Sequence, residues 1–100
     1  MNVFISQPIE NKKKDDILKR REDIFSILQN STDEQLELVD SLYINNVKDK
    51  PLVSLATAIL NMEHADIVAF DSDWCTSKRC WCEYIIANSY KKQILFIDSF

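Results

Sequence analysis

The stretch "ADIVAF" (residues 65–70) decides the fold class, because it is a short, largely apolar and β-branched run between two segments with helical patterns. Such runs are typical of strands that are buried on both faces. The segment before it, residues 51–64, begins with a proline that suits the first position of a helix. After a short loop, a helix is expected over about 77–92, capped by Ser77 or Thr76. A strand between two helices predicts a parallel sheet with helices on its faces.

The rest of the chain repeats this alternation. "NVFIS" (2–6) and "LELVD" (36–40) have the composition of strands, a helix is expected between them over about 13–29, and "QILFID" (93–98) is the last strand. The order β-α-β-α-β-α-β predicts a three-layer α/β fold with a four-stranded parallel sheet in the order 2-1-3-4, of the flavodoxin or Rossmann type. The apolar side of the second helix is expected to consist of Leu52, Leu55, Ala56, Ile59 and Leu60.

Length and charge limit the classes of function. The 100 residues are expected to form one domain over 1–100. A net charge of −4 argues against binding to nucleic acid polymers, because that function depends on neutralising phosphates. The basic cluster in residues 12–23 contains its own acidic residues and is interpreted as a solvated helix face. No apolar run approaches the roughly 20 residues that span a membrane, and the first residues lack the charged region of a signal peptide.

Cysteine and glycine usage adds two further expectations. The three cysteines lie within residues 75–82, and their odd number indicates a reducing, cytoplasmic location rather than a disulfide framework. Their spacing with His64 fits no standard zinc site, so we expect no metal and no organic cofactor. The chain contains no glycine, so backbone positions that need positive φ are expected at Asn or Asp. A glycine-rich phosphate loop is excluded.

Parallel sheets of this type bind ligands beyond the carboxyl ends of the strands, where the strand order reverses. This places Ser6-Gln7-Pro8 and the loop 71–76 at the candidate site, together with the start of the helix at Ser77. Free N–H groups at a helix start suit an anion such as phosphate. The sequence therefore predicts a small-molecule site at this edge of the sheet.

The stretch "SKRCWCEY" (77–84) contains one carboxylate, Glu83, on an otherwise mostly apolar helical stripe. Glu83 lies six residues after Ser77, deeper along the helix. A partly desolvated carboxylate at such a place can act as a nucleophile on a sugar carbon. The alternative is a surface Glu83 that pairs with Arg79 or Lys91.

Four segments carry a family resemblance through their order and spacing, although each is weak alone. They are "FISQPIENKKKDDILKRRE", "PLVSLATAILNMEHADIVAF", "DSDW" and "SKRCWCEYIIANSYKKQILFI". Together they resemble a small phage and bacterial family of unknown function that is distantly similar to nucleoside 2-deoxyribosyltransferases and 2'-deoxynucleoside 5'-phosphate N-hydrolases. The resemblance covers nearly all of the chain and implies a fold of the deoxyribosyltransferase type.

The resemblance also implies roles for individual residues. In the related enzymes the helix Glu is the nucleophile that takes the deoxyribosyl group, and it matches Glu83. In the phosphate-selective hydrolases a Ser six residues earlier contacts the 5'-phosphate, and it matches Ser77. The first-strand loop closes on the sugar or base and matches Ser6-Gln7-Pro8. The Asp that orients or protonates the base has no match, because that region reads Thr57-Ala58.

This chain departs from the family pattern where relatives carry glycine. Those positions read Glu10-Asn11, Asp73 and Arg79, and Glu10 stands where relatives tend to have arginine. Side chains at these positions hinder the close approach of backbone to a ligand. A pocket that binds nucleotides with lost or altered chemistry is therefore the alternative to an active enzyme.

Two alternatives stay open for the remaining loop residues. Trp74 either stacks on a base or plugs the end of the sheet, and Asp71 and Asp73 either bind a sugar hydroxyl or cap the turn. The expected site consists of Glu83 as the catalytic residue and, as ligand contacts, Ser6, Gln7, Pro8, Asp71, Asp73, Trp74, Ser77 and Arg79.

The sequence thus predicts a nucleotide-binding protein with a deoxyribosyltransferase-like pocket. If it is active, it cleaves or transfers at the N-glycosidic bond of a (deoxy)nucleoside or its 5'-phosphate. The alternatives are a non-catalytic phage anti-defence protein that sequesters a nucleotide signal, and a protein-interaction module. The resemblance also implies a homodimer or higher homo-oligomer.

Overall fold

The computed structural model describes residues 1–39 and 50–97. The described elements alternate along the chain as the sequence predicts, so the α/β fold class is confirmed. The ends predicted for two strands, Asp40 and Asp98, fall outside the described residues. The elements are β1 (Asn2–Ser6), α1 (Lys14–Asn30), β2 (Glu37–Val39), α2 (Pro51–Met62), β3 (Ile67–Phe70), a short 3-10 helix (Trp74–Thr76), α3 (Lys78–Ser89) and β4 (Gln93–Phe96).

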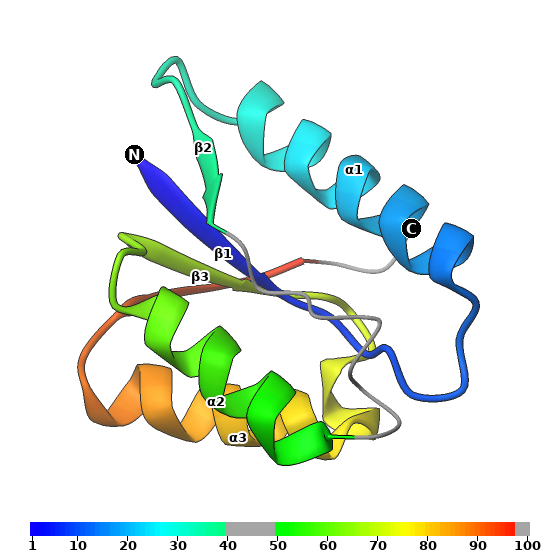
Figure 1. The fold of residues 1–100 in the computed structure, drawn as a ribbon. Coiled ribbons are helices and arrows are strands. Elements are labelled where there is room, and N and C mark those ends of the chain that lie inside the picture. The colour runs from blue at the N-terminus through cyan, green and yellow to red at the C-terminus, as the bar shows by residue number, and fades with distance from the viewer. Residues whose placement is uncertain (40–49, 98–100) are drawn as a thin grey trace.

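The four strands form one sheet in the order β2-β1-β3-β4, which is the predicted order. All three strand pairs are parallel, and the register places Phe4 opposite Val68 and Val68 opposite Ile94. Helix α1 covers one face of the sheet, and α2 and α3 lie together on the other face (Figure 1). The strand order reverses between β1 and β3, so their carboxyl ends mark the edge where a ligand site is expected.

Each face of the sheet has its own hydrophobic core, and the alternation of side chains along β1 distributes residues between them. Val3 and Ile5 pack with residues of α1 such as Ile24. Phe4 packs in the second core, which includes Ala58 of α2. Ser6 follows the same alternation as Phe4, and this directs its hydroxyl toward the layer of α2 and α3.

The buried side of α2 differs from the expectation. The helix buries Ser54, Ala58 and Met62, whereas Leu52 and Leu60 of the predicted apolar side are 79% and 70% exposed. Two of the three buried residues, Ser54 and Ala58, have small side chains. The predicted inner position of Leu52, Ala56 and Leu60 is therefore wrong, whereas Leu55 and Ile59 are half-buried.

Two of the residues that the structure describes have positive φ in this glycine-free chain. Asn11 has a φ of 62°, as expected for a residue type that tolerates the left-handed region. Lys91 also has a positive φ, of 58°, although the sequence predicts only Asn or Asp at such positions. Lys91 follows α3, where a left-handed residue commonly ends a helix. The N–H of Lys92 then donates to the carbonyl of Ala87 at 2.9 Å and completes that turn.

Candidate functional site

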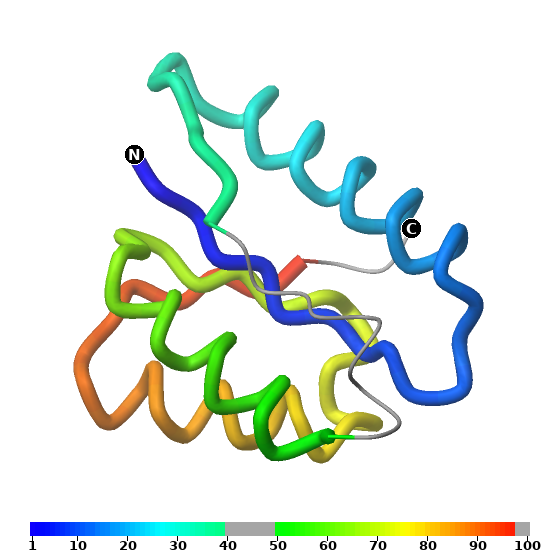
Figure 2. The backbone as a smooth tube through the Cα atoms, in the orientation of Figure 1, coloured from blue at the N-terminus to red at the C-terminus, as the bar shows by residue number. Residues whose placement is uncertain are grey.

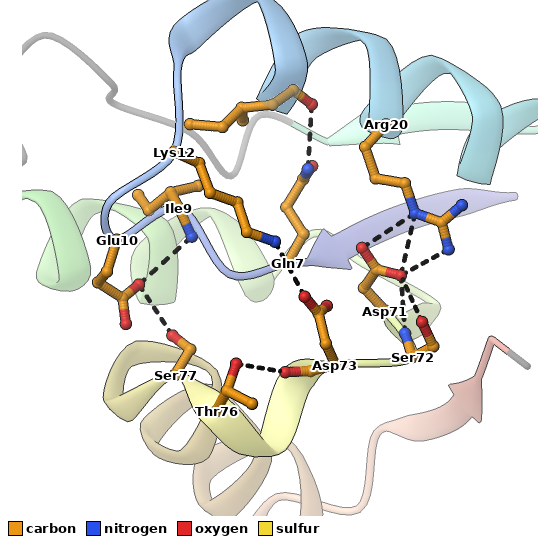
Figure 3. A network of polar contacts seen from close by, with 11 residues as sticks. Gln7, Ile9, Glu10, Lys12, Arg20, Asp71, Ser72, Asp73, Thr76 and Ser77 are labelled. Carbon is orange, nitrogen blue, oxygen red and sulfur yellow. Dashed lines mark hydrogen bonds and ion pairs between the residues drawn. The ribbon is translucent and has the colours of Figure 1, made fainter. Parts of the chain in front are cut away.

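The loops that follow β1 and β3 leave the sheet at the same edge (Figure 2). Two contacts join them, as Figure 3 shows. Lys12 Nζ lies 2.9 Å from Asp73 Oδ2, and Ser77 Oγ donates a hydrogen bond to Glu10 Oε1 at 2.9 Å. The loop after β1 is thereby fastened across the edge where parallel sheets bind ligands.

Glu83 is enclosed on the α2/α3 side of the sheet, with only 2% of the residue exposed. Ser6 Oγ, at the end of β1, donates to Glu83 Oε1 at 2.6 Å. Arg79 Nε, one turn earlier on α3, lies 3.4 Å from Glu83 Oε2, and Arg79 also donates to Ser54 Oγ of α2 at 2.8 Å. The alternative of a surface Glu83 is therefore wrong about its placement, although the ion pair with Arg79 is present.

Burial raises the pKa of Glu83 above its ordinary value, because loss of hydration disfavours the charged form. The charge of Arg79 and the hydrogen bond from Ser6 lower this pKa and offset burial only in part. The neighbouring thiol of Cys80 is also buried, and burial raises the pKa of Cys80 to about 12. Cys80 therefore stays protonated and is not a nucleophile.

A cavity of about 350 Å³ lies beside this cluster, between α2, α3 and the loop after β1. Its volume is within the range of small-molecule sites, and most of its walls are apolar. Arg79 lines this cavity and also contacts Glu83, which is not itself among the lining residues. The other walls include Ile9, Glu10, Leu52, Leu55 and Cys82.

Ser77 begins α3 and uses its hydroxyl within the chain. Its Oγ accepts a hydrogen bond from the N–H of Cys80 at 3.2 Å, as an N-cap, and donates to Glu10. The same oxygen of Glu10 also accepts from the N–H of Ile9 at 3.3 Å. A carboxylate is favourable at the start of a helix. Glu10 therefore takes the place that the sequence predicted for an external anion.

On the opposite side of the sheet, Asp71 follows β3 and pairs with Arg20 of α1. Asp71 is 3% exposed; Arg20 Nη2 lies 2.7 Å from Oδ1, and Nε lies 3.1 Å from both carboxylate oxygens. Burial alone would raise the pKa of Asp71, but the hydrogen bonds from Arg20 and from the N–H of Ser72 outweigh it. The pKa of Asp71 is therefore held below its ordinary value.

A cleft of about 610 Å³ lies beside this ion pair, between α1 and the loops after β1 and β3. Gln7 in its wall is 3% exposed, and its Nε2 donates to the carbonyl of Ile17 at 3.0 Å. Two buried oxygens of the lining, Gln7 Oε1 and Asp73 Oδ1, have no hydrogen-bond partner among residues 1–39 and 50–97. Both atoms are buried beneath the surface of the cleft, so they are not open to it.

The structure divides the predicted site residues into two groups on opposite sides of the loop after β1. Those near the 350 Å³ cavity, with Glu83, are Ser6, Ser77 and Arg79. Those that line the 610 Å³ cleft are Gln7, Pro8, Asp71 and Asp73. Glu83 lines neither space as the described residues define them.

Trp74 belongs to neither group. Its ring lies in an aromatic cluster at the end of the sheet, with centroids 5.4 Å from Phe70, 5.0 Å from Tyr84 and 4.6 Å from Trp81. This arrangement favours the alternative in which Trp74 plugs the end of the sheet.

The sequence interpretation missed three residues of these groups. Arg20 and Lys12 were placed on a solvated helix face, although Arg20 lies one turn from the buried Ile17 and can reach the sheet edge. Ser54 was overlooked because α2 was assigned the wrong inner face. The i, i+4, i+8 series of Ser54, Ala58 and Met62 was the signal available for it.

Within the described ranges, no group of three or more His, Cys, Asp or Glu side chains is arranged to hold a metal ion. Over the same residues, no helix has the length and apolar character to cross a membrane. Comparisons with protein-family models, curated proteins and solved structures found no match to this chain.

Proposed function

We propose that this chain is a nucleotide-binding protein whose ligand, a nucleoside or nucleotide, occupies the cavity lined by Arg79. The observation that carries the proposal is the Glu83 carboxylate, buried next to this cavity and held by Ser6 and Arg79. Charged groups are seldom buried without a pairing or functional reason. The mostly apolar walls suit a nucleobase, and the resemblance to deoxyribosyltransferases points to the same ligand class.

Cleavage at the N-glycosidic bond is the chemistry proposed for Glu83. Ser6 fixes Oε1 at 2.6 Å, which leaves Oε2, with its longer contact to Arg79, as the attacking atom. The bond from C1' to Oε2 forms as the bond from C1' to the base nitrogen breaks, and the base leaves with the electron pair and takes a proton from water. Water then hydrolyses the glycosyl ester, or a second base accepts the sugar. Arg79 has to swing aside to admit the sugar.

Sequestration without cleavage is the second candidate function, of the kind a phage protein would use to remove a nucleotide signal. It is favoured by the enclosure of Glu83, which is 2% exposed and contacted at both oxygens. It is also favoured by the direction of the pKa shift of Glu83, because a raised pKa increases the share of the protonated form, which is the poorer nucleophile.

Mass spectrometry separates the two candidates. The protein is incubated with a panel of nucleosides, their 5'-monophosphates, cyclic nucleotides and ADP-ribose-type signals. Cleavage predicts free base with the wild type and none with Glu83→Gln, whereas Glu22→Gln, the same change at an exposed position of α1, retains activity. Sequestration predicts unmodified ligand released on denaturation. Neither free base nor bound ligand would leave only an interaction module.

Glu10 favours a nucleoside over its 5'-monophosphate in this cavity. Its carboxylate lines the space and holds the hydroxyl of Ser77, so a phosphate there would meet a like charge. Glu10→Gln keeps an acceptor for Ser77 and removes the charge. We expect it to improve the affinity for 5'-monophosphates about tenfold relative to the parent nucleosides. Isothermal titration of both ligands with both proteins measures this ratio, and an unchanged ratio contradicts the assignment.

A homodimer through α2 is proposed as the state in solution. The helix contains no charged residue and exposes Leu52, Val53 and Leu60. Apolar surface of this kind marks interaction sites, and a twofold axis at an uncharged helix brings no like charges together. Light scattering is expected to show a dimer for the wild type and a monomer for Leu60→Lys. A monomeric wild type at micromolar concentration contradicts the proposal.

A cytoplasmic location is proposed from the cysteines. Cys75 and Cys82 are exposed free thiols, and free thiols persist in reducing compartments. Fractionation of producing cells, with the thiols trapped by alkylation, tests the location and the redox state together.

A further inference from the structure

We infer that the outer edge of β4 (Gln93–Phe96) is a pairing surface for the β4 strand of a second copy of this chain, with the two strands antiparallel. Among the described strands, β4 (red in Figure 1) pairs with β3 alone, so it forms one edge of the sheet. This surface is not the exposed face of α2 proposed for the homodimer. The inference does not rest on the function proposed for Glu83.

The edge at β4 lacks the features that protect sheet edges in other proteins. Charged side chains, proline and bulges on an edge strand discourage pairing with another chain. β4 consists of Gln, Ile, Leu and Phe, and its register with β3 is continuous. Leu95 is 36% exposed and Phe96 is 53% exposed, and side-chain alternation places them on opposite faces of the sheet. The edge is therefore apolar on both faces, as is typical of surfaces that bind another chain.

The backbone groups at this outer edge belong to Ile94 and Phe96. The N–H of Ile97 donates to the carbonyl of Phe70 on β3 at 2.8 Å. Backbone groups of successive residues in a strand point to opposite sides. Those of Leu95 therefore also face β3, and those of Ile94 and Phe96 face away from it. No strand of the described sheet lies on that side. An added strand would provide hydrogen-bond partners there.

One register matches these backbone groups and the exposed side chains together. In an antiparallel pair, two opposite residues with facing N–H and C=O groups exchange both hydrogen bonds. A twofold axis at Leu95 places Ile94 opposite Phe96 of the second copy, and symmetry forms this pair twice. The exposed ring of Phe96 then contacts Ile94 on one face of the sheet. On the other face Leu95 contacts its own counterpart, where the two strands approach most closely.

The charges beside β4 favour the antiparallel arrangement. Lys91 and Lys92 directly precede the strand. A parallel pair would bring the lysines of both copies together, whereas an antiparallel pair places them at opposite ends. β4 itself has no charged residue, so the contact between copies opposes no like charges. A second copy is therefore complementary to this edge in charge as well as in shape.

The aromatic cluster extends the apolar surface from β4 to α3. The Trp74 ring lies between those of Phe96 and Trp81, with centroid distances of 5.6 and 4.6 Å. Trp81 is 44% exposed. The twofold axis is perpendicular to the sheet, so it keeps the α3 helices of both copies on the same face. The exposed rings of the two copies then flank the paired strands.

The short length of β4 limits the strength of this contact. The strand has four residues, so the pair is expected to bury less than the roughly 1,600 Å² of a standard interface. We expect a dissociation constant on the order of 100 µM, weaker than that of a dimer through α2. Two twofold interfaces on one chain join dimers into larger assemblies, so the assembly should grow as the concentration rises.

The test uses the full chain with Leu60→Lys as the parent protein. This variant removes the interface proposed at α2 and leaves β4 intact. Sedimentation equilibrium from about 10 µM to about 1 mM is expected to show dimers of the parent at the upper end. Over the same range, amide hydrogen exchange is expected to slow several-fold at Ile94 and Phe96. The amide of Leu95 already faces β3 and is expected to change less.

Two substitutions at Leu95 test the register. Leu95→Lys and Leu95→Glu each place like charges opposite one another at the twofold axis and remove the apolar contact. Each is expected to weaken the dimer about tenfold. An equimolar mixture of the two is expected to recover most of the association, because Lys then opposes Glu. Leu18→Lys is the matched control, at a position of α1 that is 40% exposed, and is expected to dimerise like the parent.

Two results would overturn the inference. One is a parent protein that stays monomeric with unchanged exchange at Ile94 and Phe96, which would leave the edge to a strand of a different protein. The other is association that Leu95→Lys does not weaken or that the mixture does not restore, which would place the contact elsewhere. If the variants at Leu95 do not fold, as judged by circular dichroism, Phe96→Ser and the exchange of Ile94 in the parent decide the outcome.

Discussion

Asp71 and Glu83 are two buried carboxylates, each beside an arginine, and their pKa values move in opposite directions. They are 3% and 2% exposed, so neither is open to solvent, but Glu83 lies deeper in the protein than Asp71. The pKa of Asp71 is lowered, whereas that of Glu83 is raised. The difference has two causes. Glu83 loses more hydration because it lies deeper. In addition, Arg20 approaches Asp71 at 2.7 and 3.1 Å with two nitrogens, whereas Arg79 Nε lies 3.4 Å from Glu83.

The comparison shows that an adjacent arginine is not enough to compensate for burial. Charge-assisted hydrogen bonds at short distance stabilise the ionised form, and a long, single contact does so weakly. On the α1 side, the ion pair between Arg20 and Asp71 thus compensates the buried charge. The α3 side holds a carboxylate whose charge is only partly compensated, and residues of this kind are candidates for chemistry.

The largest effect is expected for Arg20→Met, which leaves Asp71 buried without its partner. The loss in free energy of unfolding at pH 7 is expected to be about 2–3 kcal/mol, at the lower end for a broken buried pair because Arg20 is 30% exposed. Urea denaturation measures it. Lys19→Met, an exposed position on the same helix, is the control. If both variants lose the same free energy of unfolding, the ion pair between Arg20 and Asp71 does not stabilise the fold.

The pH dependence of this loss has a definite sign. The folded pKa of Asp71 is below its unfolded value of roughly 3.9, so the ion pair stabilises the fold above that pH. Its contribution disappears as the pH falls through the folded pKa. The difference between the wild type and Arg20→Met should therefore shrink in acid.

Ser6→Ala tests the shorter of the two side-chain contacts described above for Glu83, the 2.6 Å hydrogen bond to Oε1. The expected loss is about 2 kcal/mol, because hydrogen bonds to charged groups are stronger than neutral ones. A double-mutant cycle with Glu83→Gln isolates the coupling between the two side chains. A coupling near zero would mean that Ser6 does not support the carboxylate, and that the two sides of the edge differ less than proposed.

Glu83 is expected to contribute to stability with a pH dependence opposite to that of Asp71, and Glu83→Gln tests this. The raised pKa means that the folded state binds the proton of Glu83 more tightly than the unfolded state does. The contribution of Glu83 to stability therefore falls as the pH rises from the unfolded pKa, roughly 4.3, through the folded pKa. Glu83→Gln does not titrate, so its stability relative to the wild type is expected to rise with pH over this range.

Asp71→Asn is the matched control for that pH profile. Its disadvantage relative to the wild type should grow with pH over the acidic range, because the wild type gains its ion pair there. Parallel profiles for Glu83→Gln and Asp71→Asn, obtained from thermal unfolding in a pH series, would contradict the contrast between the two carboxylates.

The strand and helix order was predictable because the chain alternates short β-branched runs with longer helical patterns, as at 65–70 and the helices beside it. The inner face of α2 was not, because it is formed by the small residues Ser54 and Ala58, whose burial depends on how closely α3 approaches. Counting apolar residues placed Leu60 inside, whereas it is 70% exposed.

The site was predictable in part. The apolar neighbours of Glu83 left a buried and a surface position open, and the structure shows the buried one. The pairing of Arg20 with Asp71 joins residues 51 positions apart and has no local pattern. Ser6 and Gln7 were grouped because they share a loop. Successive side chains at a strand end point to opposite faces. The sequence therefore already indicated that Ser6 and Gln7 would lie on opposite faces of the sheet.

The smallest effect is expected for Lys12→Ala, which breaks the ion pair with Asp73 that fastens the loop after β1. Its 2.9 Å distance is close to the 2.7 Å of the Arg20–Asp71 contact, but its side chains are 39% and 43% exposed. Exposed pairs are screened and contribute about 0.5 kcal/mol or less. Urea denaturation of Lys12→Ala should show this small loss at low salt and none at high salt, with Lys13→Ala as the control, whereas the loss in Arg20→Met should persist. A salt-independent loss above about 1 kcal/mol in Lys12→Ala would show that distance, rather than burial, sets the strength of the pairs at this edge.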